Sequence, residues 1–483
     1  MSLDATTVGR FVDTAWERDI LPALHDYIRI PNKSPAYDPD WEAAGHMERA
    51  VGLVSEWLER HAVDGMTVEV ERLPGRTPLV VVDVPATRPS ISGTVLLYGH
   101  LDKQPEMTGW RDGLGPWEPV VEGDRLYGRG GADDGYSAFA ALTAIAAVRE
   151  AGGDHARCMI VIEASEESGS TDLETHVDAL SERIAGVDLV VCLDSGCATF
   201  DRLWMTTSLR GIVTADLRVD VLTEGVHSGA SGTVASSFRI LRGLLSRIED
   251  EATGEMLLPE LRMPVPSEYA AFAKETAALL GDDVLTRYPL VEGARLVHED
   301  PVDVILARTW SSALSTTGAE GLPSLQDAGN VLRPYTAVHL SLRLPPGCDA
   351  EAATAALRAA LTNDPPYGAR VTVDRVESAA GWAASLGASA WFDDAVRRAS
   401  IECFGNPPGF EGEGGSIPFI NMLAERFPDA DLLVTGVLGP GTNAHGPNEF
   451  LHIPTARKLT AAVAHVLAAH ADRSDEASRA GGG

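Results

Sequence analysis

Near-continuous apolar runs, each ending at a polar residue, constrain the fold more than any other feature of this sequence. Four such runs, LVVVDVP, TVLLYGH, CMIVIEAS and DLVVCLDS, occur in the first 200 residues. Strands buried on both faces have this composition, and they form mainly parallel sheets covered by helices. Between them, DDGYSAFAALTAIAAVREAG has helical apolar spacing and ends near glycines, which predicts a crossover helix. The pattern predicts an α/β fold with a mainly parallel sheet.

The pattern changes near residue 206 and returns after residue 382. VTADLRVDVL alternates apolar and polar residues, as a half-buried antiparallel strand does. Further strand and helix segments favour a two-layer α+β domain of ferredoxin-like character at 206–382. We therefore expect one main domain, built from 1–205 and 383–475, that is interrupted by this inserted domain. The tail at 476–483 is expected to be disordered.

Charge and composition limit the classes of binding partner and the cellular compartment that we expect. The formal charge of −31 argues against nucleic acid or an anionic membrane as a partner. We attribute this charge to surface solubility in preference to exclusion of anionic ligands. No apolar stretch approaches the roughly 20 residues that span a bilayer, and the acidic N-terminal segment does not resemble a signal peptide. Five cysteines without a CxxC pair indicate no disulfide framework. We expect a cytoplasmic protein.

Acidic and histidine residues follow the apolar runs or lie in a C-terminal loop. In an open α/β sheet, ligands bind at the carboxyl ends of the strands, so these side chains are expected to share one site. Two imidazoles with a surplus of carboxylates favour a pair of divalent metal ions. The residues are His100, Asp102, Asp133, Glu166, Glu167, Asp194 and His445.

Each residue also has an ordinary structural interpretation. His100 and Asp102 are two apart on a strand and address one face, but a surface histidine at a strand end has the same pattern. Asp133 follows GRGGA and could serve only as a helix N-cap. The adjacent acids Glu166 and Glu167 are harder to explain, because they repel each other and require a cation or a proton. One can bind metal while its neighbour acts as general base.

Taken together, the motifs resemble a known superfamily. GHLD, GRGGADD, EASEESGS, LDSG, GVHSG, EGEGGSIP and NAHGPNE occur in this order along nearly the whole chain. This series is similar to the dinuclear zinc aminoacylase/carboxypeptidase/dipeptidase superfamily, and most similar to its carnosine-type, cytosolic non-specific dipeptidase branch. The resemblance implies a catalytic domain interrupted by a lid and dimerisation domain, a homodimer, and two bound Zn²⁺ ions. Mn²⁺ and Co²⁺ suit the same ligands.

The resemblance also implies roles for the metal ligands. His100 and Asp194 would bind one ion, Glu167 and His445 would bind the other, and Asp133 would bridge the two.

Two further residues are implied to support the chemistry. Asp102 would orient His100, and Glu166 would be the general base. Two positions depart from the family pattern: Gly135 stands where a lysine is common, and Lys103 stands where an apolar residue is usual. Both adjoin the site without removing a ligand.

The inserted domain is implied to contribute substrate contacts. His227 would reach the partner's site and stabilise the oxyanion, and Asn330 would contact substrate from the partner subunit. Arg343 would bind the substrate carboxylate, and Gly415 and Ser416 would supply hydrogen-bond donors. By pattern alone, His227 is equally a turn histidine, Arg343 a solvated strand arginine, and the glycine loop a plain turn.

The sequence leaves two metal-dependent activities open. The leading hypothesis is hydrolysis of dipeptides or related small peptides, and the alternative is an aminoacylase or amidase acting on N-acyl amino acids. A metal-binding scaffold without activity is disfavoured, because every implied ligand and Glu166 are present. A serine hydrolase and a P-loop enzyme are excluded, since the chain has neither GxSxG nor a Gly-Lys pair.

Overall fold

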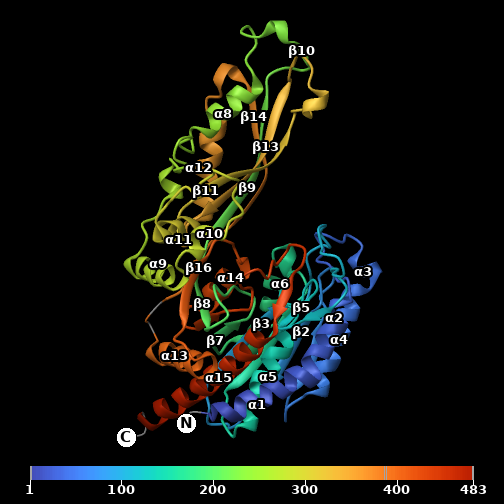
Figure 1. Ribbon diagram of the computed structural model, residues 1–483, viewed down its shortest axis with the longest axis vertical. Helices are drawn as coiled ribbons and strands as arrows, with labels where there is room; N and C mark the ends of the chain where they lie inside the picture. Colours follow the sequence, from blue (N-terminus) through green and yellow to red (C-terminus); the bar gives the residue numbers. More distant parts are fainter. Residues whose placement is uncertain (1–2, 386, 388, 481–483) are drawn as a thin grey trace. The chain divides into compact units, whose positions relative to one another are not determined.

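The chain forms two compact units. The computed structural model describes residues 3–385, 387 and 389–480, and Figure 1 labels their elements. Unit 1 comprises Met1–Thr207, Ala384–Glu411 and Met422–Gly483, and unit 2 comprises Ser208–Ala383 and Gly412–Asn421. The placement of 412–421 in unit 2 differs from the sequence expectation. Arginine side chains of unit 2 bond to the backbone of this segment and hold it there.

Unit 1 is built on a six-stranded sheet. Four neighbouring strands, in the order β6-β3-β7-β17, run parallel, and β2 joins β6 antiparallel with β1 antiparallel to β2. A mixed α/β fold with mostly parallel strands is therefore confirmed, although LVVVDVP runs against its neighbours. The strands are β1 Thr67–Glu71, β2 Leu79–Val84, β3 Thr94–His100, β6 Arg157–Glu163, β7 Val187–Cys192 and β17 Asp431–Val434.

Helices bury the central strands. All seven residues of β3 are buried, and α5 (Ser137–Glu150) packs on β3 and β6. The helices α1 (Ala5–Ala15) and α15 (Ile453–Ala480) lie beside α5 (Figure 1). Because α5 is covered by helices as well as by the sheet, eleven of its side chains are buried, which explains its alanine-rich sequence.

The C-terminal helix is longer than expected. The sequence predicts disorder from residue 476, whereas α15 continues to Ala480. Its composition, with charged and small residues, is compatible with helix formation. Residues 481–483 lie outside the described part of the chain.

Further helices and strands belong to unit 1 or to the segments that connect it with unit 2. They include two three-stranded sheets, with the strand orders β18-β5-β4 and β15-β8-β16. No helix among the described residues combines the length and apolar character needed to cross a membrane. The helices are η1 Trp16–Ile20, α2 Leu21–Ile28, α3 Trp41–Ala44, α4 His46–Arg60, η2 Glu166–Ser168, α6 Leu173–Ala179, α7 Ser181–Ile184, α13 Ala390–Phe404 and α14 Pro418–Arg426. The strands are β4 Val120–Glu122, β5 Arg125–Tyr127, β8 Trp204–Leu209, β15 Trp382–Ala383, β16 Gly409–Glu413 and β18 Phe450–His452.

Unit 2 is a two-layer α+β structure. Its antiparallel sheet orders as β11-β13-β9-β14, and α8 and α12 cover one face (Figure 1). Along β9, buried and half-buried residues alternate, as expected when one face packs on helices. The elements are β9 Gly211–Asp220, α8 Ser237–Leu245, β11 Ala313–Glu320, β13 Tyr335–Leu344, α12 Ala350–Thr362 and β14 Arg370–Ala379.

Strand β11 was not expected from the sequence. It reads ALSTTGAE, and six of its eight residues are exposed. An edge strand with no buried face lacks apolar alternation, so only pairing with β13 defines it. Elsewhere in unit 2 lie α9 Ser267–Leu280, α10 Asp283–Thr286, α11 Pro301–Thr309, β10 Val226–His227, β12 Val331–Leu332, η3 Ser228–Ala230, η4 Pro259–Leu261, η5 Leu325–Asp327 and η6 Pro366–Gly368.

Candidate dinuclear metal centre

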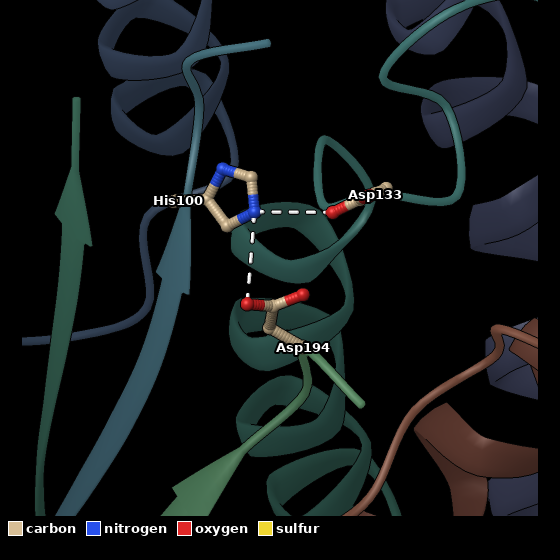
Figure 2. Close-up of side chains that lie close together, drawn as sticks. All are labelled: His100, Asp133 and Asp194. Carbon is tan, nitrogen blue, oxygen red and sulfur yellow. Dashed lines mark hydrogen bonds and ion pairs between the residues drawn. The ribbon is translucent and has the colours of Figure 1, made fainter. Parts of the chain in front are cut away.

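Three buried side chains converge where the parallel strands end. His100 is the last residue of β3, Asp194 follows β7 by two residues, and Asp133 lies in the loop before α5 (Figure 2). His100 Nε2 lies 3.3 Å from Asp133 Oδ1 and 3.7 Å from Asp194 Oδ2. Each residue offers one ligand atom, and these atoms lie within 4.8 Å of one another. This group, the first cluster, can hold one metal ion.

A second cluster shares Asp133. His445 Nε2 lies 3.1 Å from Asp133 Oδ2 and 3.2 Å from Glu167 Oε2. Asp133 thus directs one oxygen to each imidazole. The ligand atoms of Asp133, Glu167 and His445 again lie within 4.8 Å of one another. Two adjoining clusters with one common carboxylate have the composition of a dinuclear site.

Asp102 fixes the two adjacent glutamates. Glu166 and Glu167 form the start of η2, and their backbone N–H groups donate to Asp102 Oδ1 and Oδ2 at 3.1 and 3.0 Å. With this turn held, Glu167 reaches His445, while Glu166 Oε2 lies 4.0 Å from His100 Nε2. Glu166 therefore borders the first cluster without being one of its three members.

The contact between Asp102 and His100 differs in detail from the expectation. His100 Nδ1 lies 3.1 Å from the backbone carbonyl oxygen of Asp102 and 3.5 Å from its carboxylate Oδ1. Nδ1–H therefore donates to Asp102, chiefly to its carbonyl, and Nε2 is left to face the acids. The carboxylate mainly accepts from the glutamate turn.

The clusters carry an excess of buried negative charge. Burial would lower the pKa of His445, but hydrogen bonds with Asp133 and Glu167 raise it to about 11. Burial raises the pKa of Glu166 well above its usual range, and the charge of Asp194 adds to this. The pKa of Glu167 is raised by burial and by Asp133.

This electrostatic pattern fits metal ions. Burial lowers the pKa of His100 and of His445, but the surrounding carboxylates outweigh it and raise the pKa of both imidazoles. A cation would supply the same positive charge and leave the imidazole nitrogen free as a ligand. Nitrogen and carboxylate donors without a thiolate suit Zn²⁺, and also Mn²⁺ or Co²⁺.

Several residues around the clusters were not identified from the sequence. Gln104 Nε2 donates to Glu167 Oε2 at 2.6 Å. Asp134 is buried and accepts from the backbone N–H of His100 at 3.2 Å. The buried carboxylate of Glu163 accepts from the hydroxyls of Ser165 and Ser170. Asp134 and Glu163 lie within the quoted motifs and Gln104 lies two residues after one, but short polar motifs do not reveal which residues bond to the ligands.

The two departures from the family pattern have structural explanations. Lys103 is fully buried, and its Nζ donates to the carbonyl oxygens of Tyr27 and Ile30, each at 2.8 Å. Gly135 has no room for a side chain, since a Cβ would lie 2.1 Å from Tyr27 Cε1 and 2.5 Å from the carbonyl oxygen of Gly130. A lysine therefore does not fit at residue 135 in this backbone.

Two predicted substrate residues lie together in unit 2. His227 pairs with Val331 across β10 and β12, and the N–H of Ser228 donates to the carbonyl of Asn330 at 2.9 Å. His227 Nδ1 accepts from the backbone N–H of Gly229 at 3.0 Å. In the neutral ring the proton is then on Nε2, which is a donor, and the side chain is exposed.

The other predicted substrate residues form a second group in unit 2. Arg343 Nη1 donates to Ser416 Oγ at 2.9 Å, and Gly415, beside Ser416, is exposed. Arg210 donates to the carbonyls of Gly414 and Ser311, each at 3.1 Å. Burial and the charges of Arg343 and Arg308 lower the pKa of Arg210 to about 10. Guanidinium groups gathered in this way favour an anion.

Comparison with known proteins identifies the family. The model of the peptidase family M20/M25/M40 matches residues 96–469. The chain belongs to this family. The match includes every member of both clusters, and the residues of the two groups in unit 2 fall within the same range.

Relatives match over most of their length. The cysteinylglycine-S-conjugate dipeptidase of Corynebacterium striatum is 28% identical, over 75% of this chain and 79% of the relative. The β-Ala-His dipeptidase of Homo sapiens is 26% identical, over 89% and 86%. The structure of the dipeptidase Dug1p from Saccharomyces cerevisiae superposes with a TM-score of 0.76 at 23% identity, covering 98% of this chain and 99% of the other. This structural match establishes the fold.

Proposed function

We propose that this M20 peptidase is a metal-dependent dipeptidase that cleaves the amide bond of dipeptides or related small peptides. The observation that carries the proposal is the pair of clusters that share Asp133, with Glu166 beside them. The dipeptidase names of the relatives from Corynebacterium striatum and Homo sapiens support a dipeptide over an N-acyl amino acid as substrate.

The two clusters indicate which residues would hold each of two metal ions. His100 and Asp194 would hold one ion, Glu167 and His445 the other, and Asp133 would bridge them. Two divalent ions at such a site polarise the scissile carbonyl and lower the pKa of the attacking water. Zn²⁺ is the ion we expect from the donor set.

Glu166 is the proposed proton carrier. Its carboxylate borders the first cluster, and its position is fixed by the bond from its own N–H to Asp102. A carboxylate in this position can take a proton from water and return it to the departing amine.

Unit 2 is proposed to bind the substrate. His227, with its proton on Nε2, can donate to the oxyanion. Arg343 and Ser416 would bind the substrate carboxylate, with Gly415 and Asn330 as further contacts. We propose that this unit is the lid and dimerisation domain, and that His227 and Asn330 act in the partner's site of a homodimer.

Substrates that differ only in the amine distinguish the two activities. A dipeptide and its N-acetylated counterpart share the scissile bond and the carboxylate. We expect the zinc-loaded protein to hydrolyse the dipeptide and to act poorly on the N-acetylated form. The reverse preference would make the chain an aminoacylase and contradict the dipeptidase proposal.

Substitution Glu166→Gln tests the mechanism. Loss of a general base lowers kcat by about 10²- to 10⁴-fold, while both clusters stay intact, so metal content should not change. The measurement is kcat on a dipeptide together with zinc content by elemental analysis. Glu174→Gln, at an exposed position of α6, is the matched control. Unchanged turnover in Glu166→Gln would refute the role.

A further inference from the structure

A fully buried ion pair lies beside the second cluster. Arg129 Nη1 donates to Glu449 Oε2 at 2.5 Å, and the two side chains are 1% and 0% exposed. The residues are 320 positions apart in the chain. Taking two charges out of water is unfavourable, and an apolar pair of similar size is often at least as stable. The stability of the fold alone therefore does not explain this pair.

Arg129 connects three loops. Its Nη2 donates to the carbonyl of Gly446, next to His445, at 2.7 Å. Its Nε donates to the carbonyl of Pro105 at 3.2 Å, next to the residue that bonds to Glu167. One planar guanidinium thus bonds to backbone next to His445 and next to Gln104, the residue that donates to Glu167.

Glu449 completes the connection from the other side. Its Oε1 accepts from the backbone N–H groups of Gly130 and Ala132, at 3.0 and 3.4 Å. Its carbonyl accepts from the N–H of Gly128 at 3.1 Å. Ala132 directly precedes Asp133, so Glu449 holds the loop that carries the shared carboxylate.

The loop that carries His445 needs such external contacts. Its φ angle is positive at Asn443, His445 and Asn448, a backbone conformation that is uncommon for residues other than glycine. The side chain of His445 is 55% exposed, so burial does not fix it. Besides the bonds of Arg129, the described loop is held from outside by the N–H of Arg111, which donates to Asn448 Oδ1 at 2.7 Å.

We propose that Arg129 and Glu449 are positioning residues that hold His445 beside Asp133 and thereby assemble the second cluster. The inference rests on the proposed metal centre. Neither residue is a member of a cluster, and the pair acts through the ligands that it places. Loss of the pair should therefore weaken metal binding, and more strongly at the second cluster, which contains both His445 and Asp133, than at the first, which shares only Asp133.

Calorimetric titration of the metal-free protein with Zn²⁺ tests this inference. The wild-type chain should bind two ions. In Glu449→Gln, which keeps the side-chain shape but loses the charge, we expect one of the two sites to bind about 10- to 100-fold more weakly. Activity should fall through kcat at low zinc and recover in excess zinc, with KM little changed.

Arg129→Lys separates geometry from charge. Lysine keeps the positive charge opposite Glu449, but its single nitrogen cannot reproduce the bonds that three separate nitrogens of Arg129 make to Glu449, Gly446 and Pro105. A positioning role predicts that Arg129→Lys also loses affinity at one site. Wild-type binding in this variant would mean that charge alone matters and would overturn the inference.

A second ion pair in unit 1 provides the matched control. Arg157, the first residue of β6, pairs with Asp83 of β2 through two bonds, and neither residue is a cluster member. Arg157→Lys should leave both zinc affinities unchanged. Two unchanged sites in Glu449→Gln would also overturn the inference. If wild-type protein itself binds no zinc, the proposed metal centre fails instead, so the two failures are distinguishable.

Discussion

At the residue scale, the side chain of Asp102 places two adjacent glutamates, Glu166 and Glu167, at different parts of the site. Its two carboxylate oxygens accept from the N–H groups of Glu166 and Glu167. The tight turn that results directs one glutamate to His445 and leaves the other near His100. Adjacent acids in a sequence indicate a cation site, but this turn determines which acid joins which cluster.

Arg343 gives a prediction on substrate recognition. Its guanidinium is half-buried, bonds to Ser416 and lies near other guanidinium groups. We expect Arg343→Met to raise KM for a dipeptide by at least about tenfold, since a charged hydrogen bond contributes about 1.5–3 kcal/mol. The KM for the same dipeptide with a C-terminal carboxamide should change little. Equal losses on the acid and the amide would contradict recognition of the carboxylate.

Glu163 gives a prediction on pH. Burial raises its pKa to about 7 from an ordinary value of 4.5, and the charge of Asp102 adds to this. The folded chain thus binds this proton more tightly than the unfolded chain. Its contribution to stability is full below pH 4.5 and is lost as pH rises to about 7.

Removing the carboxyl group should remove this pH dependence. Urea unfolding of the metal-free protein gives the free energy of unfolding at pH 4.5 and at pH 8. Between these two pH values, the difference in this free energy between Glu163→Gln and wild type should change by up to about 3 kcal/mol in favour of the variant. The exposed Glu174→Gln should follow wild type at both pH values. A constant difference between Glu163→Gln and wild type would show that Glu163 does not carry the shift.

At the element scale, the ends of three parallel strands create the site. β3, β6 and β7 are adjacent and parallel, so His100, the glutamate turn and Asp194 follow at the same edge. The polar residues can be close only because the apolar strands before them are packed in register. The site therefore depends on the strand core as well as on its own bonds.

Leu97 tests this dependence within β3. Its side chain is fully buried in the main core of unit 1. We expect Leu97→Ala to lower the free energy of unfolding by about 2–5 kcal/mol, through lost burial and the cavity that remains. Denaturant unfolding measures this. Val121→Ala, at an exposed position of β4, should stay within about 0.5 kcal/mol of wild type. A loss below 1 kcal/mol in Leu97→Ala would contradict the packing argument.

At the scale of the whole molecule, both clusters lie in unit 1. Metal bound only to the folded state adds stability according to its concentration and affinity. We expect chelation to abolish hydrolysis and to increase hydrogen exchange in the loop at 443–449 and in the glutamate turn. The strands β9 and β13 of unit 2 should keep their protection. Full turnover after exhaustive chelation, with no metal detected, would refute the metal centre.

Local sequence patterns were enough to predict the mainly parallel α/β core and the types of residue at the strand ends. Both follow from local patterns: apolar runs specify buried strands, and parallel strands bring their carboxyl ends to one edge. The six-residue exposed stretch of β11 carries no such pattern, so its pairing with β13 was not predictable.

The assembly of the site depends on long-range contacts that local patterns do not contain. The division of Asp133 between two imidazoles, the bonds of Asp102 to the glutamate turn, and the ion pair of Arg129 with Glu449 join segments far apart in the chain. Local propensity does not encode such contacts, because they form only when loops with unusual backbone conformations are brought together by the packed core. The candidate ligands can be predicted from the sequence, whereas their geometry depends on long-range packing.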